Sequence, residues 1–577
     1  MPLRLRRRLT AASGLAALSA LLVLVLGLVA APAAGAQPQV PADGRVSVDS
    51  NEGQADDGPS VQAESFTGVL SADGRFVAFS SGAPDLAAGD DNDQPDIYLR
   101  DRLLGTTERI SVNTAEVGGN DASVSPAISD DGRFVAFASR SDNLGGNDLN
   151  GLFDIFLRDR QAGTTTKVSR GFNFLNLQPD GDSRNPAISG DGSTVAFESD
   201  ATNLVSGDGN GERDIFVWDV ASATATRASV ANDESESGND SFGAALDQDG
   251  NVVAFHSDAA DLIGVNDTNG VRDVYARNLT TGTTFRVSVD SSGNQVAQPS
   301  FLPSVNDSGT SFAFDTDAAL VPADDNGLRD VYVRTPAANQ FFYVSADTGG
   351  GAANGESHGA AISGDGTRVA FDSEASDLVG SDTNGAGQDV FVRTLTGTPT
   401  TTLISTRPGV VVPGGAETAD IADNGIVAFD SDAANLVPGD TNGRFDVFVG
   451  GEVCDGRLVD VDLNLGNSPT ANADVILGTP GDDTVDGLAG ADRFCGAAGA
   501  DRFVGGLGAD RAFGGPGADR LDGGDGRDHL EGNGDADVLK GGVGNDTLKG
   551  GAGTDTCKGQ DGTGDTASTC EVTTGVP

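Results

Sequence analysis

The chain is poor in basic residues. Its 577 residues include only four lysines, and 86 acidic against 36 basic side chains give a formal charge of −50. Nucleic-acid phosphates are bound by clustered Lys and Arg, so this composition excludes a nucleic-acid partner. So acidic a chain repels itself unless cations neutralise it, which favours an environment outside the cell.

Residues for catalysis are equally scarce. The three histidines, His256, His358 and His529, are scattered, and no His-x-x-x-His spacing occurs. Trp218, the only tryptophan, occupies a strand position that elsewhere holds arginine. We expect it to be partly exposed or at a blade edge, packing there rather than stacking on a sugar. We identify no catalytic residue, and we lean towards a function that is not enzymatic.

Long apolar runs are absent except at the start. Arg4 to Arg8 are followed by an apolar stretch over 11–29 and by Ala34-Gly35-Ala36, a pattern typical of a cleaved signal peptide over 1–36. An uncleaved anchor helix is the alternative, and the export route stays open between the general secretory and twin-arginine systems. No second apolar span follows, so we expect a mature chain without a transmembrane segment. We expect it to be extracellular, or periplasmic in a double-membrane bacterium.

Glycine, in contrast, is abundant, and much of it lies in a nine-residue repeat that runs without a break from Gly478 to Lys558. The type unit is Gly-Gly-Val-Gly-Asn-Asp-Thr-Leu-Lys at 541–549. The fourth position holds Gly481, Gly490, Gly499, Gly508, Gly517, Gly526, Gly544 and Gly553, with Asp535 as the one exception. The sixth position holds Asp483, Asp492, Asp501, Asp510, Asp519, Asp528, Asp537, Asp546 and Asp555, and the eighth is apolar.

This spacing has a physical interpretation. Glycines permit tight turns that aim carbonyls inward, and the remaining three residues form a minimal strand with one apolar side chain inside. Carboxylate and carbonyl oxygens are ligands for calcium. The segment resembles the RTX (haemolysin-type) calcium-binding repeats, which implies a parallel β-roll. By that resemblance, the glycines and aspartates given above would hold calcium between successive coils. A glycine-rich linker is the alternative, which nine units in register disfavour.

Four cysteines in an exported chain suggest two disulfides, and the sequence alone permits three pairings. We favour Cys454–Cys495 and Cys557–Cys570, which would clamp the two ends of the roll.

Two short sequence motifs, Val-Ala-Phe or a variant of it and an Asp followed by Ile or Val, recur together seven times between Gly44 and Gly450. Each unit is expected to contain four short strands separated by turns, as at 126–129, 133–139, 154–158 and 165–169. Such repeats predict a seven-bladed β-propeller. Val-Ala-Phe or a variant ends at Phe79, Phe137, Phe197, Phe255, Phe314, Phe371 and Phe429, and Asp precedes Ile or Val at Asp96, Asp154, Asp214, Asp273, Asp330, Asp389 and Asp446.

The seventh unit lacks its last strand, and Arg45-Val46-Ser47-Val48 has the missing pattern. We therefore expect the N-terminal strand to complete the last blade and close the ring. The phrases at 71–79 (SADGRFVAF) and 96–101 (DIYLRD) resemble TolB-like, WD-type propeller repeats.

In six of the seven units the loop before the third strand contains Asp-x-Asn, then usually Gly, and Asp at the sixth following position, as in Asp148, Asn150, Gly151 and Asp154. The remaining loop, with Asp382, Asn384, Gly385 and Asp389, carries one extra residue. Alternating oxygen side chains resemble part of a calcium loop, although the bidentate Glu is missing. The alternative, which we favour, is a tight Asn-Gly turn held by the Asp.

The sequence therefore predicts an all-β chain. We expect a signal peptide (1–36), a linker (37–44), a propeller (45–450), a connecting segment (451–477), a calcium-binding roll (478–570) and a tail (571–577). Three functions remain open: a secreted calcium-binding protein whose propeller binds a protein or glycan, an extracellular polysaccharide hydrolase or lyase with its site in the propeller channel, and a structural envelope or matrix component.

Overall fold

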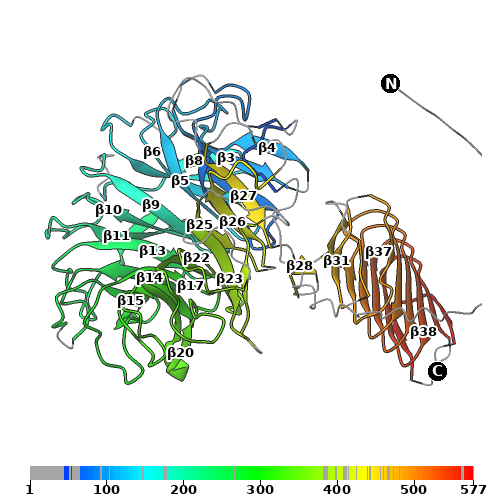
Figure 1. The fold of residues 1–577 in the computed structure, drawn as a ribbon. Coiled ribbons are helices and arrows are strands. Elements are labelled where there is room, and N and C mark those ends of the chain that lie inside the picture. Colours follow the sequence, from blue (N-terminus) through cyan, green and yellow to red (C-terminus); the bar gives the residue numbers. More distant parts are fainter. Residues whose placement is uncertain are drawn as a thin grey trace, which may run out of the picture. The chain divides into compact units, whose positions relative to one another are not determined.

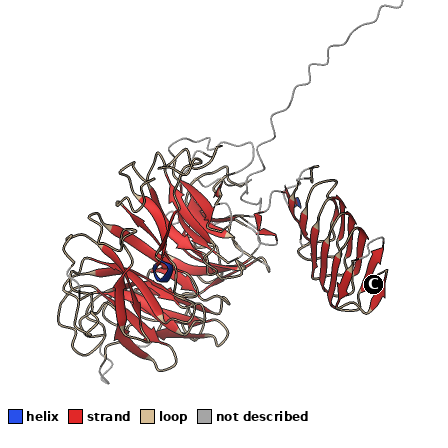
Figure 2. Ribbon diagram, turned by 90° about the horizontal axis from the view of Figure 1, so that it is seen from below, coloured by secondary structure: helices blue, strands red, loops and turns tan. Residues whose placement is uncertain are grey.

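The structure is a computed structural model. It describes residues 44–575 except 51–52, 55–64, 91, 93, 103, 146–147, 173–177, 265–266, 381–386, 397–398, 407–411, 413–414, 424, 438–439, 441–443, 452, 455–456, 459–460, 464–467, 472, 480 and 561–563. The predicted signal peptide and nearly all of the linker lie outside these residues. The described part consists almost entirely of strands and loops (Figure 2), and no helix in it is long and apolar enough to cross a membrane.

Seven antiparallel sheets follow one another along the chain and confirm the predicted seven-bladed propeller (Figure 1). Blade 1 contains β1 (Ser65–Leu70), β2 (Phe76–Ser81), β3 (Asp96–Asp101) and β4 (Thr106–Arg109); blade 2, β5 (Ser123–Ile128), β6 (Phe134–Ser139), β7 (Asp154–Asp159) and β8 (Thr164–Lys167); blade 3, β9 (Ser183–Ile188), β10 (Thr194–Ser199), β11 (Asp214–Asp219) and β12 (Thr224–Arg227). Blade 4 contains β13 (Ser241–Leu246), β14 (Val252–Ser257), β15 (Asp273–Asn278) and β16 (Thr283–Arg286); blade 5, β17 (Ser300–Val305), β18 (Phe312–Thr316), β19 (Asp330–Thr335), the 3₁₀ turn η1 (Pro336–Ala338) and β20 (Gln340–Tyr343). Blade 6 contains β21 (Ser357–Ile362), β22 (Arg368–Ser373), β23 (Asp389–Thr394) and β24 (Thr401–Leu403); blade 7, β25 (Ala416–Ile421), β26 (Val427–Ser431) and β27 (Asp446–Gly450).

The Val-Ala-Phe strands form the core of the blades. In β6, for example, Val135, Ala136 and Phe137 are fully buried. The phenylalanine stacks on an aromatic ring of the third strand, and Phe137 and Phe156 have ring centroids 5.9 Å apart. Because strand side chains alternate between the two faces of a sheet, a fully buried run requires a sheet covered on both faces, which neighbouring blades provide.

The N-terminal segment closes the ring as predicted. Arg45 bridges to Phe448 of β27, and the Val46 amide donates to the Val447 carbonyl at 2.7 Å. Val46 is buried against Val447 and Val449. This pairing covers the edge of β27 that the three-stranded blade 7 would otherwise expose.

The C-terminal repeats form two parallel sheets. One contains β30 (Val461–Asp462), β31 (Val475–Leu477), β33 (Arg493–Cys495), β35 (Arg511–Gly515), β37 (His529–Gly534), β39 (Thr547–Ala552) and β41 (Thr566–Ser568). The other contains β32 (Thr484–Asp486), β34 (Arg502–Leu507), β36 (Arg520–Asp525), β38 (Val538–Val543), β40 (Thr556–Gln560) and β42 (Val572–Thr574). Strand partners lie 18 residues apart, as in Leu521 with Leu539, so two nonapeptides make one coil. The predicted β-roll is confirmed.

One apolar side chain per nonapeptide points into the roll, as the repeat predicts. These eighth-position residues, at most 3% exposed, are Val485, Phe494, Phe503, Ala512, Leu521, Leu530, Leu539, Leu548 and Cys557, with Ile476 continuing the row. β30, β31 and β42 also show that the sheets reach beyond the predicted range of 478–570.

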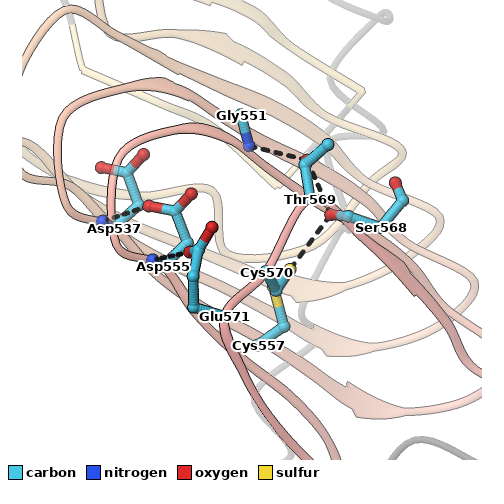
Figure 3. The surroundings of a disulfide bond; sticks show 8 residues. All are labelled: Asp537, Gly551, Asp555, Cys557, Ser568, Thr569, Cys570 and Glu571. Carbon is cyan, nitrogen blue, oxygen red and sulfur yellow. Dashed lines mark hydrogen bonds between the residues drawn. A yellow bond between two sulfur atoms is a disulfide. The ribbon is translucent and has the colours of Figure 1, made fainter.

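The ends of the roll carry the two favoured disulfides, Cys454–Cys495 and Cys557–Cys570. A short two-stranded sheet, β28 (Val453–Cys454) with β29 (Arg457–Leu458), precedes the roll. At the C-terminal end, shown in Figure 3, the Asp555 amide donates to the Glu571 carboxylate at 2.6 Å. Glu571 thus takes the place of the next aspartate in the series.

Candidate calcium sites

The sixth-position aspartates form a row inside the glycine turns. From Asp492 to Asp555 each is at most 1% exposed. One carboxylate oxygen of each accepts the backbone amide of the aspartate 18 residues earlier, as in Asp510 to Asp528 at 2.9 Å and Asp519 to Asp537 at 2.8 Å. The carboxylates therefore link one coil to the next and fix their orientation.

The second carboxylate oxygen, Oδ2, faces a cradle of backbone oxygen. A methyl group built on Gly505, the first residue of its repeat, would lie 2.3 Å from Oδ2 of Asp510 and 2.5 Å from the carbonyl oxygen of Gly523 in the next coil. The same arrangement recurs at Gly496 with Asp501 and Gly514. Among the described residues, Oδ2 is buried without a hydrogen-bond donor in Asp501, Asp510, Asp519, Asp528, Asp537, Asp546, Asp555 and Asp565.

A desolvated carboxylate oxygen beside a carbonyl oxygen is unfavourable unless a cation lies between them. Carboxylates and carbonyls are the ligands that calcium takes, so the residues present fit calcium. Within the described residues no three His, Cys, Asp or Glu side chains converge on a metal-sized site. A calcium ion here would therefore depend on first-position glycine carbonyls such as those of Gly514 and Gly523, which the sequence analysis did not single out.

The fourth-position glycines have a steric role. From Gly490 to Gly553 their φ angles lie between +124° and +158°, a region closed to other residues. A methyl group on Gly508 would lie 1.4 Å from the Gly490 carbonyl oxygen of the preceding coil. Gly481 differs: the nearest atom to its added methyl is the Thr479 hydroxyl at 3.8 Å. Their predicted role as calcium ligands stays a prediction.

The aspartate row is longer than the sequence analysis proposed. Asp474, nine residues before Asp483, donates its amide to Asp492, and Asp565 accepts the amide of Asp546. Asp474 could have been found by extending the period upstream, whereas an extra residue before Asp565 breaks the spacing. Asp474 and Asp483 are exceptions within the row, because the Thr470 amide donates to Oδ2 of Asp474 at 2.5 Å and the Thr479 amide donates to Oδ2 of Asp483 at 2.6 Å. This end of the row is thus capped by a neighbour.

Protons compete with cations at these carboxylates. Burial raises the pKa of Asp528 and Asp537 to about 7 and that of Asp501 to about 6. Unfolded aspartates titrate near 3.9, so the ion-free roll is more stable at low pH and loses that stability as the pH rises through 6 to 7. Calcium must displace the proton, so its affinity falls as the pH falls through the same range.

In blades 1 to 5 the asparagine side chain of the Asp-x-Asn loop accepts the backbone amide two residues on, as the favoured turn interpretation predicts. The corresponding asparagines of blades 6 and 7 lie outside the described residues. In blade 2, Asn150 accepts the Leu152 amide at 2.9 Å and donates to Asp154 at 3.1 Å. Lys167 then pairs with Asp148 at 3.0 Å and with Asp154 at 2.7 Å. A side-chain cation therefore occupies the space that an ion would need in this loop.

Trp218 is 5% exposed and packs in the core of its blade, so the predicted packing is confirmed and the predicted partial exposure is wrong. Its ring is buried because Leu204 and Phe216 belong to the same apolar cluster. A cavity of about 720 Å³ opens beside it and is also lined by Arg170, Phe172, Arg227 and Glu234.

A family model matches the C-terminal repeats. Residues 470–564 match the RTX calcium-binding nonapeptide repeat in four overlapping copies, at 470–503, 496–530, 504–539 and 531–564. The RTX resemblance is thereby confirmed, and the chain fits a calcium-binding protein. No curated protein matches the chain.

Solved structures similar to the chain include TolB propellers, as the repeats predicted. A protein assigned as TolB from Agrobacterium tumefaciens is 16% identical with a TM-score of 0.30, covering 48% of this chain and 79% of that one. TolB from Acinetobacter baumannii is 17% identical with a TM-score of 0.29, covering 53% and 62%. An oligogalacturonate lyase in complex with manganese is 11% identical with a TM-score of 0.40, covering 67% and 90%. No activity is carried over from similarities this low.

Proposed function

We propose that this chain is a secreted calcium-binding protein whose roll takes up calcium between coils. The observation that supports it is the row of buried Oδ2 atoms. Those of Asp501, Asp510, Asp519, Asp537 and Asp565 lie beside a glycine carbonyl of the next coil, and that of Asp555 lies beside the Thr569 carbonyl. Bound cations would neutralise both the row and the acidic surface around it. Two disulfides and the RTX repeats fit an extracellular setting, where calcium is plentiful and disulfides persist.

A calorimetric calcium titration of the full chain tests this function. The Asp519→Asn/Asp537→Asn variant is expected to bind fewer ions than the wild type, because two linked carboxylates lose charge. Asp522→Asn is the matched control, since Asp522 lies three residues from Asp519 but pairs with Lys540 at 2.6 Å. The wild-type affinity is expected to be lower at pH 5.5 than at pH 7.5. Equal stoichiometry in the wild type and the double variant would contradict the proposal.

The propeller is proposed to act as the platform that binds a protein or glycan. The cavity beside Trp218 supports this role, since it combines an apolar wall with Arg170 and Glu234. Phe172, 56% exposed at its rim, offers an apolar contact. Binding to a panel of glycans and envelope proteins is expected to weaken in Phe172→Ser and to persist in Leu149→Ser, another exposed apolar residue. Self-assembly in calcium without binding any member of the panel would favour the structural alternative instead.

A further inference from the structure

All seven blades pair the aromatic residue of the third strand with a residue of the last strand, and five of these partners are cationic. They are Arg109 opposite Tyr98, Lys167 opposite Phe156, Arg227 opposite Phe216, Arg286 opposite Tyr275, and Arg45 opposite Phe448. The partner is Leu403 in blade 6, whose Asp-x-Asn loop lies outside the described residues, and Tyr343 in blade 5. Each cation lies between the two aspartates of its blade's Asp-x-Asn loop. Arg227, for example, is 3.1 Å from Asp208 and 2.9 Å from Asp214.

Blade 5 has the two aspartates but lacks the cation. Tyr343 takes the register position opposite Tyr332, and the two rings stack with centroids 5.1 Å apart. Asp324 and Asp330 are 6% and 0% exposed, and among the described residues no Lys, Arg or His forms an ion pair with either. The Tyr343 hydroxyl carries no charge that could replace the missing guanidinium.

The polar contacts in blade 5 leave one buried oxygen without a donor. Tyr332 donates to Oδ2 of Asp324 at 2.5 Å, while Asp330 accepts from Ser345 at 2.7 Å and from Asn326 at 3.0 Å. Oδ1 of Asp324 has no hydrogen-bond partner in the described part of the chain. Two buried carboxylates without a compensating positive charge are strongly unfavourable.

We propose that Asp324 and Asp330 form a calcium site in blade 5, separate from the roll. The ion takes the place that arginine or lysine fills in five other blades, and its hard-cation chemistry matches the two carboxylates. The two charges of calcium balance those of Asp324 and Asp330. The proposal is independent of calcium binding by the roll.

The aromatic residues of the chain allow this site to be observed alone. All four tyrosines and the single tryptophan precede residue 451, so the roll itself contains no tyrosine and no tryptophan. Terbium(III), a hard cation that replaces calcium, luminesces when a neighbouring tyrosine absorbs light and transfers the energy. We expect the full-length wild type to give tyrosine-sensitised terbium luminescence that added calcium reverses.

Two variants and two controls decide the proposal. Asp324→Asn removes a ligand and Tyr343→Arg restores the internal cation, so both are expected to lose the signal while Trp218 emission reports a folded propeller. Asp267→Asn changes an aspartate beside Tyr275 where Arg286 already supplies the charge, and it is expected to keep the signal. The roll variant Asp519→Asn/Asp537→Asn should also keep it. No signal in the wild type, or an unchanged signal in folded Asp324→Asn, means that the pair holds a proton instead and overturns the proposal.

Discussion

Excess EGTA at pH 8 is expected to unfold the roll and to leave the propeller folded. Each desolvated Asp oxygen without a partner costs about 1–3 kcal/mol. The combined cost of eight such oxygens is as large as the free energy of unfolding of a whole domain, which is about 5–15 kcal/mol. The apolar core that stabilises the roll against this cost is small, since each nonapeptide buries only one apolar side chain, such as Leu521 or Leu530.

Far-UV circular dichroism and limited proteolysis measure this effect. Most of the β signal of residues 461–574 should disappear in EGTA and return with calcium, and new cleavage sites should fall in that range. Emission of Trp218, which lies in β11, serves as the control that the propeller keeps its fold. A full β spectrum in excess EGTA at this pH would mean that the hydrogen bonds between coils suffice without an ion.

Gly517→Ala is expected to abolish the calcium-dependent folding of the roll. The φ angle of Gly517 is +140°, and the added methyl would lie 1.6 Å from the Gly499 carbonyl oxygen. The two coils cannot move apart without breaking the strand pairing of β33 with β35 and of β34 with β36. The combined backbone strain and overlap should cost at least about 3 kcal/mol.

Gly481→Ala is the matched control. Gly481 holds the same position in the repeat, but the nearest atom to an added methyl lies 3.8 Å away. Its substitution should change the free energy of unfolding by less than about 0.5 kcal/mol. A calcium titration followed by circular dichroism distinguishes the two variants. If Gly517→Ala folds with the same calcium midpoint as the wild type, the two coils do not approach each other as closely at this position as the structure shows.

The sequence by itself determined the architecture of both halves. The nonapeptide spacing of Asp510, Asp519 and Asp528 determines which residues form the turn, which side chain is buried and which position carries the carboxylate. Each of these roles depends only on residues that are near in the sequence. The Val-Ala-Phe landmarks likewise predict the buried strand of each blade, and the missing strand of blade 7 indicates its partner at Arg45. The sequence favoured the disulfide pairing but did not determine it, since four cysteines permit three pairings.

Only the tertiary structure decided which side chains and carbonyl groups face one another between neighbouring coils and between neighbouring strands. The carboxylate of Asp510 meets the carbonyl of Gly523 because the coil is 18 residues long, and local sequence does not show which carbonyl lies beside it. Trp218 is buried, and so are Arg100 and Arg158 at the same position of other blades, so an arginine in this strand position does not indicate exposure. The Asp-x-Asn loops look alike in sequence, yet Lys167 fills one and Tyr343 leaves another without a cation. The charge balance of a buried site depends on which side chains lie opposite one another on paired strands. That register is set only when the sheet has folded.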